Sequence, residues 1–269
     1  MINLTTGQFY GHTNQLIQVE GLTLTDTEYT HDWVDWHFHE NAYFTFILEG
    51  CVLEGNKKET YHCSAGSLLF HNWQEAHYNS KPPGFTRGFH IELESNWFNS
   101  LDLDLSRVQG SLNVVNPQLQ VLLYKIFKES KVEDTTRYVA IQSLLIEAVS
   151  RLGGYEKDAY RTLPSWVIQL RNVLHDTPLE NWTLPALAQT VGIHPVHLSR
   201  SFTQYFNCTL SHYIRSIKIQ RALALLPQKN RSLTDIAYEC GFADQSHFIR
   251  CFKEVYQSKP SAYRTILAR

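Results

Sequence analysis

The sequence contains no run of about 18 consecutive apolar residues, which is the length that a membrane-spanning helix needs. It also lacks a basic N-terminal patch followed by an apolar stretch, so no secretory signal is visible. These two absences predict a chain that stays in the cytoplasm and has no membrane partner.

Cysteine is scarce and irregularly placed. The 269 residues include five cysteines, an odd number, and no two of them have C-x-x-C spacing. A disulfide framework or a zinc ribbon would need paired or closely spaced cysteines. We therefore expect reduced and mostly buried thiols. The five are Cys51, Cys63, Cys208, Cys240 and Cys251.

Several sequence motifs of enzymes are missing as well. There is no G-x-S-x-G, no phosphate-binding glycine loop and no H-E-x-x-H. Glu92 and Glu94 would point to one face of a strand, but paired carboxylates at the mouth of a barrel are more often solvated surface. The chain is therefore not expected to be an enzyme.

Charge is the property that divides the chain. Residues 1–162 hold 12 Lys and Arg against 20 Asp and Glu, a net charge of −8, whereas residues 163–269 hold 12 against 6, a net charge of +6. The overall value of −2 hides this asymmetry. A polyanionic partner is therefore expected for the second half alone.

The first half has the pattern of a β-structure. Between about residues 16 and 95, short apolar runs alternate with turn residues, as in 43–55, 62–71 and 86–93. No helical periodicity intervenes. An antiparallel β-sandwich or β-barrel is predicted.

After about residue 115, the spacing between apolar residues changes from two to three or four. Apolar residues in 116–130 and 136–152 recur with helical spacing, which predicts two amphipathic helices. Their apolar stripes would pack on the barrel or against a second copy of the chain. The segment 153–164 has two glycines and several charges and ends at Pro164, so it is predicted to be a linker.

The remainder is helical and contains an internal repeat. Residues 184–206 and 233–256 match with one extra residue in the second turn, which indicates two copies of one supersecondary unit. The matched positions are Leu184/Leu233, Leu187/Ile236, Ala188/Ala237, Gly192/Gly241, Leu198/Phe248, Arg200/Arg250, Phe202/Phe252 and Phe206/Tyr256.

Each repeated unit has the pattern of a helix-turn-helix. Thr183 and Ser232 are good N-cap residues for a short first helix. Gly192 and Gly241 follow that helix, where a left-handed backbone needs no Cβ. A second helix with polar residues at its start comes next, as in DNA-binding helix-turn-helix units.

The second helices would begin near His194 and Asp244 and place their first turns in the major groove of DNA. Arg can pair with guanine and Gln with adenine. Two αα-hairpins in a helical bundle, with solvated arginines, are the alternative. The predicted DNA-binding residues are Pro195, Val196, Ser199, Arg200, Asp244, Gln245, Ser246, His247 and Arg250; Leu198, Phe202, Phe248 and Phe252 should be core.

A long helix over 211–227, ended by Pro227, would hold the two units at a fixed separation. Basic residues on and beyond it are candidates for phosphate contacts or for solvated surface. They are Arg215, Lys218, Arg221, Lys229, Arg231, Lys253, Lys259 and Arg264.

Residues 183–264 resemble the DNA-binding domain of AraC-type (AraC/XylS) transcription regulators. The stretch SLTDIAYECGFADQSHFIRCFKEVYQSKPSAYR follows that family's second helix-turn-helix and closing P-S-x-Y-R segment, and HYIRSIKIQRALALL resembles its linker helix. The resemblance implies a regulator that binds double-stranded promoter DNA. Where the family usually has Gly after each recognition helix, this chain has Asn207 and Gln257.

In that family the first half is often a cupin-like barrel that binds a small-molecule effector, followed by helices that form a homodimer. The segments HFHENAYFTFILEG and AGSLLFHNWQEAHYN resemble the two strand pairs of such a barrel. His37, His39 and His77 stand at the histidine positions of metal-binding cupins. Tyr43 or Phe44 replaces the acidic ligand, so no carboxylate is expected beside the histidines.

Three interpretations of these histidines stay open: a divalent metal site, an effector pocket and structural histidines. We expect an effector pocket and no obligatory cofactor. A metal-dependent cupin enzyme fused to a DNA-binding module is the alternative function. The predicted effector-binding residues are Trp36, His37, His39, Tyr43 and His77.

The predicted fold is therefore multi-domain, with β-structure first and an all-α domain last. The expected order is a cupin-like barrel over 1–110, a helical dimerisation segment over 111–152, a linker over 153–164 and a double helix-turn-helix domain over 165–269.

Overall fold

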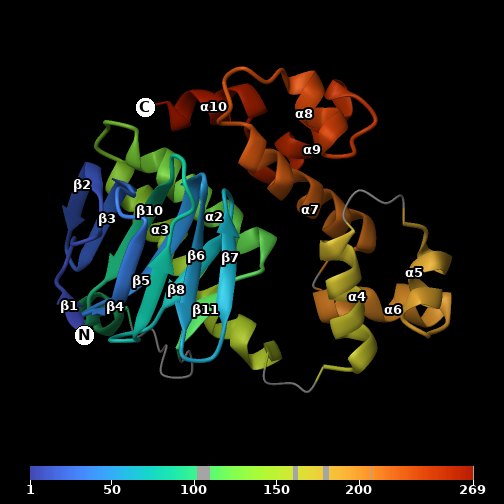
Figure 1. The fold of residues 1–269 in the computed structure, drawn as a ribbon, viewed down its shortest axis with the longest axis horizontal. Coiled ribbons are helices and arrows are strands. Elements are labelled where there is room, and N and C mark those ends of the chain that lie inside the picture. The colour runs from blue at the N-terminus through green and yellow to red at the C-terminus, as the bar shows by residue number, and fades with distance from the viewer. Residues whose placement is uncertain (102–109, 160–162, 178–181, 207, 269) are drawn as a thin grey trace. The chain divides into compact units, whose positions relative to one another are not determined.

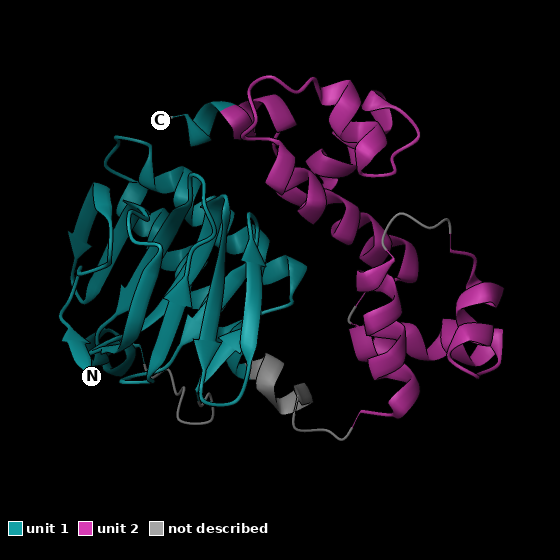
Figure 2. Cartoon of the chain, viewed as in Figure 1, with its two compact units in different colours: residues 1–157, 265–269 teal, residues 158–264 magenta. Residues whose placement is uncertain are grey.

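The structure, a computed structural model, describes residues 1–101, 110–159, 163–177, 182–206 and 208–268, without the side chains of 154–159. The chain divides into two compact units (Figure 2), Met1–Lys157 with Thr265–Arg269, and Asp158–Arg264. Among the described helices, none combines the length and apolar character that crossing a membrane requires.

The first unit contains two facing β-sheets (Figure 1). One has five strands in the order β1-β4-β9-β6-β7, and the other has six in the order β11-β8-β5-β10-β3-β2. Neighbouring strands are antiparallel except β1 and β4, which confirms the predicted antiparallel β-structure. The strands are β1 (Ile2–Leu4), β2 (His12–Val19), β3 (Leu22–Glu28), β4 (Trp33–His39), β5 (Ala42–Glu49), β6 (Cys51–Asn56), β7 (Thr60–Ser64), β8 (Leu68–His71), β9 (His77–Ser80), β10 (Arg87–Leu93) and β11 (Ser111–Asn113).

Strand β10 is buried on both of its faces, because one faces the other sheet and one faces helices. Side chains alternate along a strand, so neighbouring residues point to opposite faces. Phe89 packs edge-on against Phe127 in the helix that follows the sheets, with ring centroids 5.2 Å apart. His90 and Glu92 point the other way, into the space between the sheets. A single strand therefore carries helix-packing and cavity residues in alternation.

Strand register determines which polar side chains meet between the sheets. His37 of β4 pairs with His77 of β9. In the other sheet, Tyr43 of β5 pairs with His71 of β8 and with Glu92 of β10. Five polar residues from five different strands thereby become neighbours within their sheets.

Three helices belong to the first unit: α1 (Ser95–Ser100), α2 (Pro117–Ser130) and α3 (Arg137–Ala159). Asn116 caps α2 by accepting hydrogen bonds from the backbone N–H groups of Gln118 and Leu119. The helix predicted over 136–152 continues to Ala159, so the first residues of the predicted linker 153–164 are helical; residues 160–162 lie outside the described part.

The apolar stripes of α2 and α3 are buried within the unit. Leu119, Leu123 and Phe127 of α2 are fully buried, and so are Leu145 and Leu152 of α3. The two stripes are therefore not free to pair with a second copy. The predicted homodimer through 116–152 stays a prediction, and it would have to use the other face of α3.

A buried ion cluster joins the end of α2 to the six-stranded sheet. The Asp26 carboxylate accepts hydrogen bonds from Arg87 Nε and Nη2 at 2.7 and 2.6 Å and from Lys131 Nζ at 2.5 Å. Burial alone would raise the pKa of Asp26, but the hydrogen bonds from Arg87 and Lys131 outweigh it and hold the pKa below its ordinary value.

The second unit is helical, as predicted. Its helices are α4 (Ser165–Asp176), α5 (Leu184–Thr190), α6 (Pro195–Phe206), α7 (Leu210–Leu225), α8 (Leu233–Glu239), α9 (Gln245–Tyr256) and α10 (Pro260–Leu267), whose last residues are counted with the first unit. Helix pairs α5–α6 and α8–α9 are the two repeated units.

The local signals that predicted these helix pairs are present in the structure. The side chains of Thr183 and Ser232 accept the N-cap hydrogen bonds of α5 and α8. Gly192 and Gly241 have φ of +69° and +75°. Gln257 follows α9 with φ of +51°, a left-handed conformation that glycine adopts more easily. Asn207, its counterpart after α6, lies outside the described residues.

Each repeated unit has its own core. Leu198 and Phe202 of α6 pack in a cluster with Leu170, Leu187 and Tyr213. In the second helix pair, Phe248 and Phe252 of α9 belong to a chain of ring contacts that continues to Tyr256 and Tyr263. All four predicted core residues of α6 and α9 are at most 1 % exposed.

Candidate nucleic-acid interface and histidine cavity

Helices α6 and α9 present equivalent polar faces to the outside. On α6, Val196, Ser199 and Arg200 are exposed at positions i, i+3 and i+4, which lie on one side of a helix. On α9, Ser246 and Arg250 are exposed at positions that match Val196 and Arg200. Pro195, Gln245 and His247 are half-buried. The structure thus brings most of the predicted DNA-binding residues onto two exposed helix starts.

Asp244 and His247 have structural roles at the start of α9. The Asp244 carboxylate is the N-cap and accepts a hydrogen bond of 2.7 Å from the backbone N–H of His247. His247 Nδ1 accepts from the backbone N–H of Ala243. An acidic side chain here stabilises the helix start, whereas it would repel a phosphate. The base-reading roles predicted for Asp244 and His247 are therefore weaker than those for Ser246 and Arg250.

Gln245 is held by a residue that the sequence interpretation missed. Thr234 Oγ1, on α8, donates a hydrogen bond of 2.6 Å to Gln245 Oε1. The amide NH₂ of Gln245 is left to donate to a partner. A polar residue on the first helix of the repeat was visible in the sequence, but its pairing across the turn was not.

Several basic residues that were candidates for phosphate contacts instead form hydrogen bonds or ion pairs with other residues of the same unit. Lys218 Nζ donates to Gly241 O at 2.7 Å, which fastens α7 to the turn of the second helix-turn-helix. Arg264 donates to the carbonyl oxygens of Leu226 and Arg231. Arg215 pairs with Glu254 and Arg231 with Glu239. The other predicted contacts, which are all exposed, stay candidates: Arg221, Lys229, Lys253 and Lys259.

The space between the two sheets of the first unit holds a cavity of about 30 Å³, which we call the histidine cavity. Such a volume accommodates about two water molecules. Six histidines line it, together with tyrosines, a carboxylate and two aromatic residues of the N-terminal segment. The main lining residues are Phe9, Tyr10, Tyr29, His31, His37, His39, Tyr43, Glu54, His71, His77 and His90.

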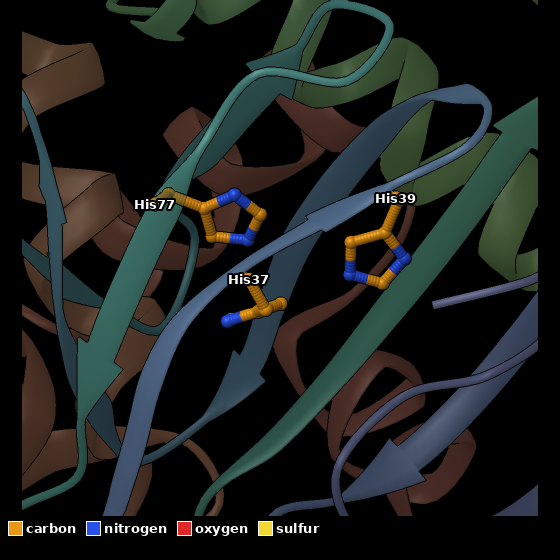
Figure 3. Close-up of side chains that lie close together, drawn as sticks. All are labelled: His37, His39 and His77. Atoms are coloured by element: carbon orange, nitrogen blue, oxygen red, sulfur yellow. The ribbon is translucent and has the colours of Figure 1, made fainter. Parts of the chain in front are cut away.

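His37, His39 and His77 lie together, as Figure 3 shows. The first two come from β4 and point to one face of it, and His77 comes from the neighbouring β9. The ring centroid of His77 is 4.2 Å from that of His37 and 5.7 Å from that of His39. Tyr43 Oη is 2.9 Å from His77 Nε2. The structure therefore brings four of the five predicted effector-binding residues together.

Trp36, the fifth, is not among the residues lining the cavity. It stands between Asp35 and His37 on β4, so its side chain points to the opposite face and packs edge-on against Tyr78, with ring centroids 5.1 Å apart. Strand alternation alone places Trp36 on that face. The assignment of Trp36 to the pocket was wrong.

The expectation that the histidines have no carboxylate neighbour was also wrong. Glu54 of β6 is 5 % exposed, and its Oε1 lies 3.8 Å from His77 Nε2 and 3.9 Å from His71 Nε2. His71 and His90 line the same cavity. Glu54 occupies no ligand position of the two cupin-like motifs, so only the pairing of β6 with β9 reveals it.

Glu92, predicted to be solvated surface, is fully buried. Its Oε2 accepts a hydrogen bond from the backbone N–H of Gly7, and its Oε1 lies 4.0 Å from His39 Nδ1. Burial raises the pKa of Glu92 to about 7, since the charged form loses its hydration. Glu94 is half-buried at the N-cap of α1.

Burial favours the neutral form of four histidines of the cavity, because it lowers their pKa. It lowers the pKa of His77 and of His90 to about 3, and the neighbouring His37 lowers that of His77 further. Burial lowers the pKa of His71 and of His39 well below its ordinary value, with a smaller contribution from His77. Burial also raises the pKa of Glu54 well above its ordinary value. Neutral imidazole is the form that binds metal ions or accepts hydrogen bonds.

Two sets of side chains have ligand atoms close enough for one metal ion: His37, His39 and His77, and Glu54, His71 and His77. The first is the set that the sequence suggested. The second is new, and it contains a carboxyl group.

The geometry of the second unit defines a class: helical domains in which two similar helix pairs, α5–α6 and α8–α9, flank the long helix α7. Comparison with known proteins supports that class. A family profile described as a helix-turn-helix domain matches residues 187–266. The probable transcription factor PqrA of Proteus vulgaris is 33 % identical over 85 residues, which are 32 % of this chain and 70 % of that protein. The chain belongs to this family, the AraC-type helix-turn-helix transcription regulators.

Other relatives match over smaller parts of their length. An HTH-type transcriptional regulator of Haemophilus influenzae is 31 % identical over 87 residues, 32 % of this chain and 29 % of that protein. The transcriptional activator RhaR of Mannheimia succiniciproducens is 24 % identical over 55 % of this chain and 54 % of its own length. The chain thus spans about a third to a half of the length of these two.

Solved structures of ToxT from Vibrio cholerae are similar over most of both chains. An apo form has a TM-score of 0.41 and 16 % identity, over 93 % of this chain and 98 % of that one. A second ToxT structure has a TM-score of 0.40 and 14 % identity, over 93 % of this chain and all of that one.

Proposed function

We propose that this chain is a sequence-specific transcription regulator that binds double-stranded promoter DNA through α6 and α9. The observation that carries the proposal is the repeated placement of an exposed arginine, Arg200 and Arg250, at the sixth residue of each second helix. A guanidinium there can donate two hydrogen bonds to one guanine. Two equivalent helices joined by α7 would read two successive segments of the major groove.

Charge supports the same function. The excess of six positive charges in residues 163–269 suits a polyanion, and the acidic first half does not. Lys229, Lys253 and Lys259 are exposed and available for phosphate contacts. Such contacts would fix the position of the protein on DNA without reading its sequence.

The first unit is proposed to sense a small molecule in the histidine cavity, with His37, His39, Tyr43 and His77 as its contacts. The polar groups that converge in the buried space between the two sheets support a binding site. Binding would favour one arrangement of the regulator over another and so change its affinity for DNA.

A homodimer is part of the proposal. Since the apolar stripes of α2 and α3 are buried, contact would use the remaining face of α3, where Val139 is 66 % exposed and Tyr138 38 % exposed. Two copies would then read a promoter site with two related halves.

The decisive experiment is selection of bound DNA from a random pool by the full chain. We expect one recurring sequence, long enough for two reading helices. The Arg200→Ala/Arg250→Ala double variant is the control, and it should enrich no sequence. Equal enrichment by both proteins would remove the base-reading assignment, and no enrichment by the unmodified chain would refute the proposed function. Repeating the selection with candidate metabolites tests effector control.

A further inference from the structure

Glu54, His71 and His77 form a compact group on three strands of the two sheets. Glu54 is on β6, His71 on β8 and His77 on β9, and all three residues are at most 5 % exposed. One ligand atom of each lies within 4.8 Å of the others. The group differs from the set His37, His39 and His77, with which it shares only His77.

The carboxylate of Glu54 is incompletely satisfied. A hydrogen bond with the Asn79 side chain engages the group, yet Oε1 has no hydrogen-bond partner among the described residues. The distances of 3.8 and 3.9 Å to the two Nε2 atoms are too long for hydrogen bonds. A buried carboxylate oxygen without a partner is costly, so its position between two imidazoles points to a bound cation.

The Nε2 atoms of both imidazoles lie near Glu54 Oε1. His77 Nδ1 lies 3.0 Å from the carbonyl oxygen of Glu75, to which only an N–H can donate. Its Nε2 therefore carries the lone pair, which accepts a hydrogen bond of 2.9 Å from Tyr43 Oη, and a bound ion would take the place of that hydrogen. His71 Nδ1 lies 2.9 Å from Ser111 Oγ, and an N–H donated there leaves the Nε2 lone pair available. Histidines that bind metals are commonly oriented by this kind of second hydrogen bond.

The spacing fits a transition-metal ion. Metal–nitrogen and metal–oxygen bonds of about 2.1 Å can join two ligand atoms that are up to about 4.2 Å apart. The observed 3.8 and 3.9 Å from Glu54 Oε1 lie within that limit, and the ligand atoms of His71 and His77 lie within 4.8 Å of each other, so the three side chains would have to close in on a bound ion. Tyr43 Oη, which donates a hydrogen bond to His77 Nε2 at 2.9 Å, would turn its hydroxyl to another acceptor when an ion binds there.

The size of the cavity also favours an ion. Its volume of about 30 Å³ admits a metal ion and a water molecule without displacing the walls. Phe9 covers one side of it, with its ring stacked on that of His90 and the centroids 3.8 Å apart.

We propose that the histidine cavity binds one divalent transition-metal ion through Glu54 Oε1, His71 Nε2 and His77 Nε2. Two imidazoles and one carboxylate are a ligand set that suits Zn²⁺, with positions left open for water or another ligand. A metal ion as the ligand that the cavity senses rests on the proposed sensing role. Binding of the ion can be measured without DNA.

The test is titration of the metal-stripped full chain with Zn²⁺ by calorimetry, with Co²⁺ as a second probe read by its visible absorption. We expect one equivalent to bind. Glu54→Gln keeps an amide for Asn79, and His71→Asn keeps a polar group for Ser111, so both variants should fold while each removes one ligand atom. Each should weaken Zn²⁺ binding at least about 100-fold.

The control is His62→Asn on the exposed edge strand β7, which should bind Zn²⁺ as the unmodified chain does. Melting of the metal-free variants shows whether they fold. Absence of stoichiometric binding in the unmodified chain would overturn the proposal. So would binding that survives in folded Glu54→Gln and disappears in His37→Asn, because the ion would then belong to the other set.

Because the titration contains no DNA, its failure leaves the proposed function standing. Conversely, failure of the DNA selection leaves the metal site standing. Operator affinity measured with and without Zn²⁺ then asks whether the ion is part of the regulation.

Discussion

Thr234 of α8 and Gln245 of α9 are joined by a hydrogen bond of 2.6 Å from Oγ1 to Oε1, across the turn of the second helix-turn-helix. The bond fixes the amide of a predicted base-reading residue before any DNA is present. A preoriented donor loses less conformational entropy on binding than a free one.

Removing this bond should weaken operator binding without unfolding the unit. For Thr234→Val we expect a loss of about 1 kcal/mol, since one hydrogen bond that orients the Gln245 amide is lost. Operator affinity measured by fluorescence anisotropy checks this. The same substitution in a Gln245→Ala background should have almost no effect. An equal loss in both backgrounds would show that Thr234 acts independently of Gln245.

The exposed arginines should determine sequence preference. Arg200→Ala and Arg250→Ala are each expected to weaken binding to the selected site by about 1–3 kcal/mol and to relax preference at one position of it. Binding to unrelated DNA should change far less. Arg151→Ala, which removes an exposed arginine from the first unit, is the matched control. Unchanged operator affinity in both variants would contradict the base-reading roles.

Two residues with left-handed backbone follow helices, and substitutions at them should change the free energy of unfolding in opposite directions. Gln257 has φ of +51°, so Gln257→Gly should stabilise the second unit by up to about 1 kcal/mol. Gly192 has φ of +69°, and an added Cβ would meet no atom within 4 Å, so Gly192→Ala should destabilise by about 1 kcal/mol through backbone strain alone. Urea unfolding measures both, and the same sign for the two would contradict this account.

The ion cluster of Asp26 should be sensitive to loss of one partner. Arg87→Met leaves a buried carboxylate with Lys131 only and is expected to destabilise the first unit by about 3–5 kcal/mol. Urea unfolding measures this, and the double variant Asp26→Leu/Arg87→Met should recover much of the loss. Because the folded pKa of Asp26 lies below its unfolded value, its contribution is complete above about pH 4 and is lost as the pH falls through the folded pKa.

His90 should make the first unit sensitive to mild acid. Its pKa falls from about 6.5 in the unfolded chain to about 3 in the folded one, so the unfolded chain binds the proton first. The free energy of unfolding of the first unit is therefore highest above about pH 6.5. Protonation of His90 in the unfolded chain lowers it by about 2 kcal/mol at pH 5 relative to pH 7. Urea unfolding at both values checks this. His90→Asn should reduce the difference, and His62→Asn should not.

Local sequence signals predicted the helical half of this protein well, because caps, turn glycines and apolar spacing act over a few residues. Thr183, Ser232 and Gly192 stand where the sequence placed them. The hydrogen bond from Lys218 to the carbonyl oxygen of Gly241 could not be predicted, since it depends on how α7 packs against a turn 23 residues away.

Prediction of the histidine cavity was less complete, since sheet neighbours are set by strand pairing over long sequence separations. Alternation along β4 correctly placed His37 and His39 on one face, and the same rule puts Trp36 on the other. Glu54 could not be assigned from its own surroundings in the sequence. Only the register of β6 against β9 brings it to His77.

The alternation along β10 has an evolutionary consequence. Positions 90 and 92 face the cavity, whereas positions 89, 91 and 93 face the helices, so substitutions at the two sets change different properties of the protein. A lineage could alter the chemistry that the cavity recognises while inheriting an unchanged helix interface. A mutagenesis library restricted to positions 90 and 92 would vary the cavity while leaving the helix interface unchanged.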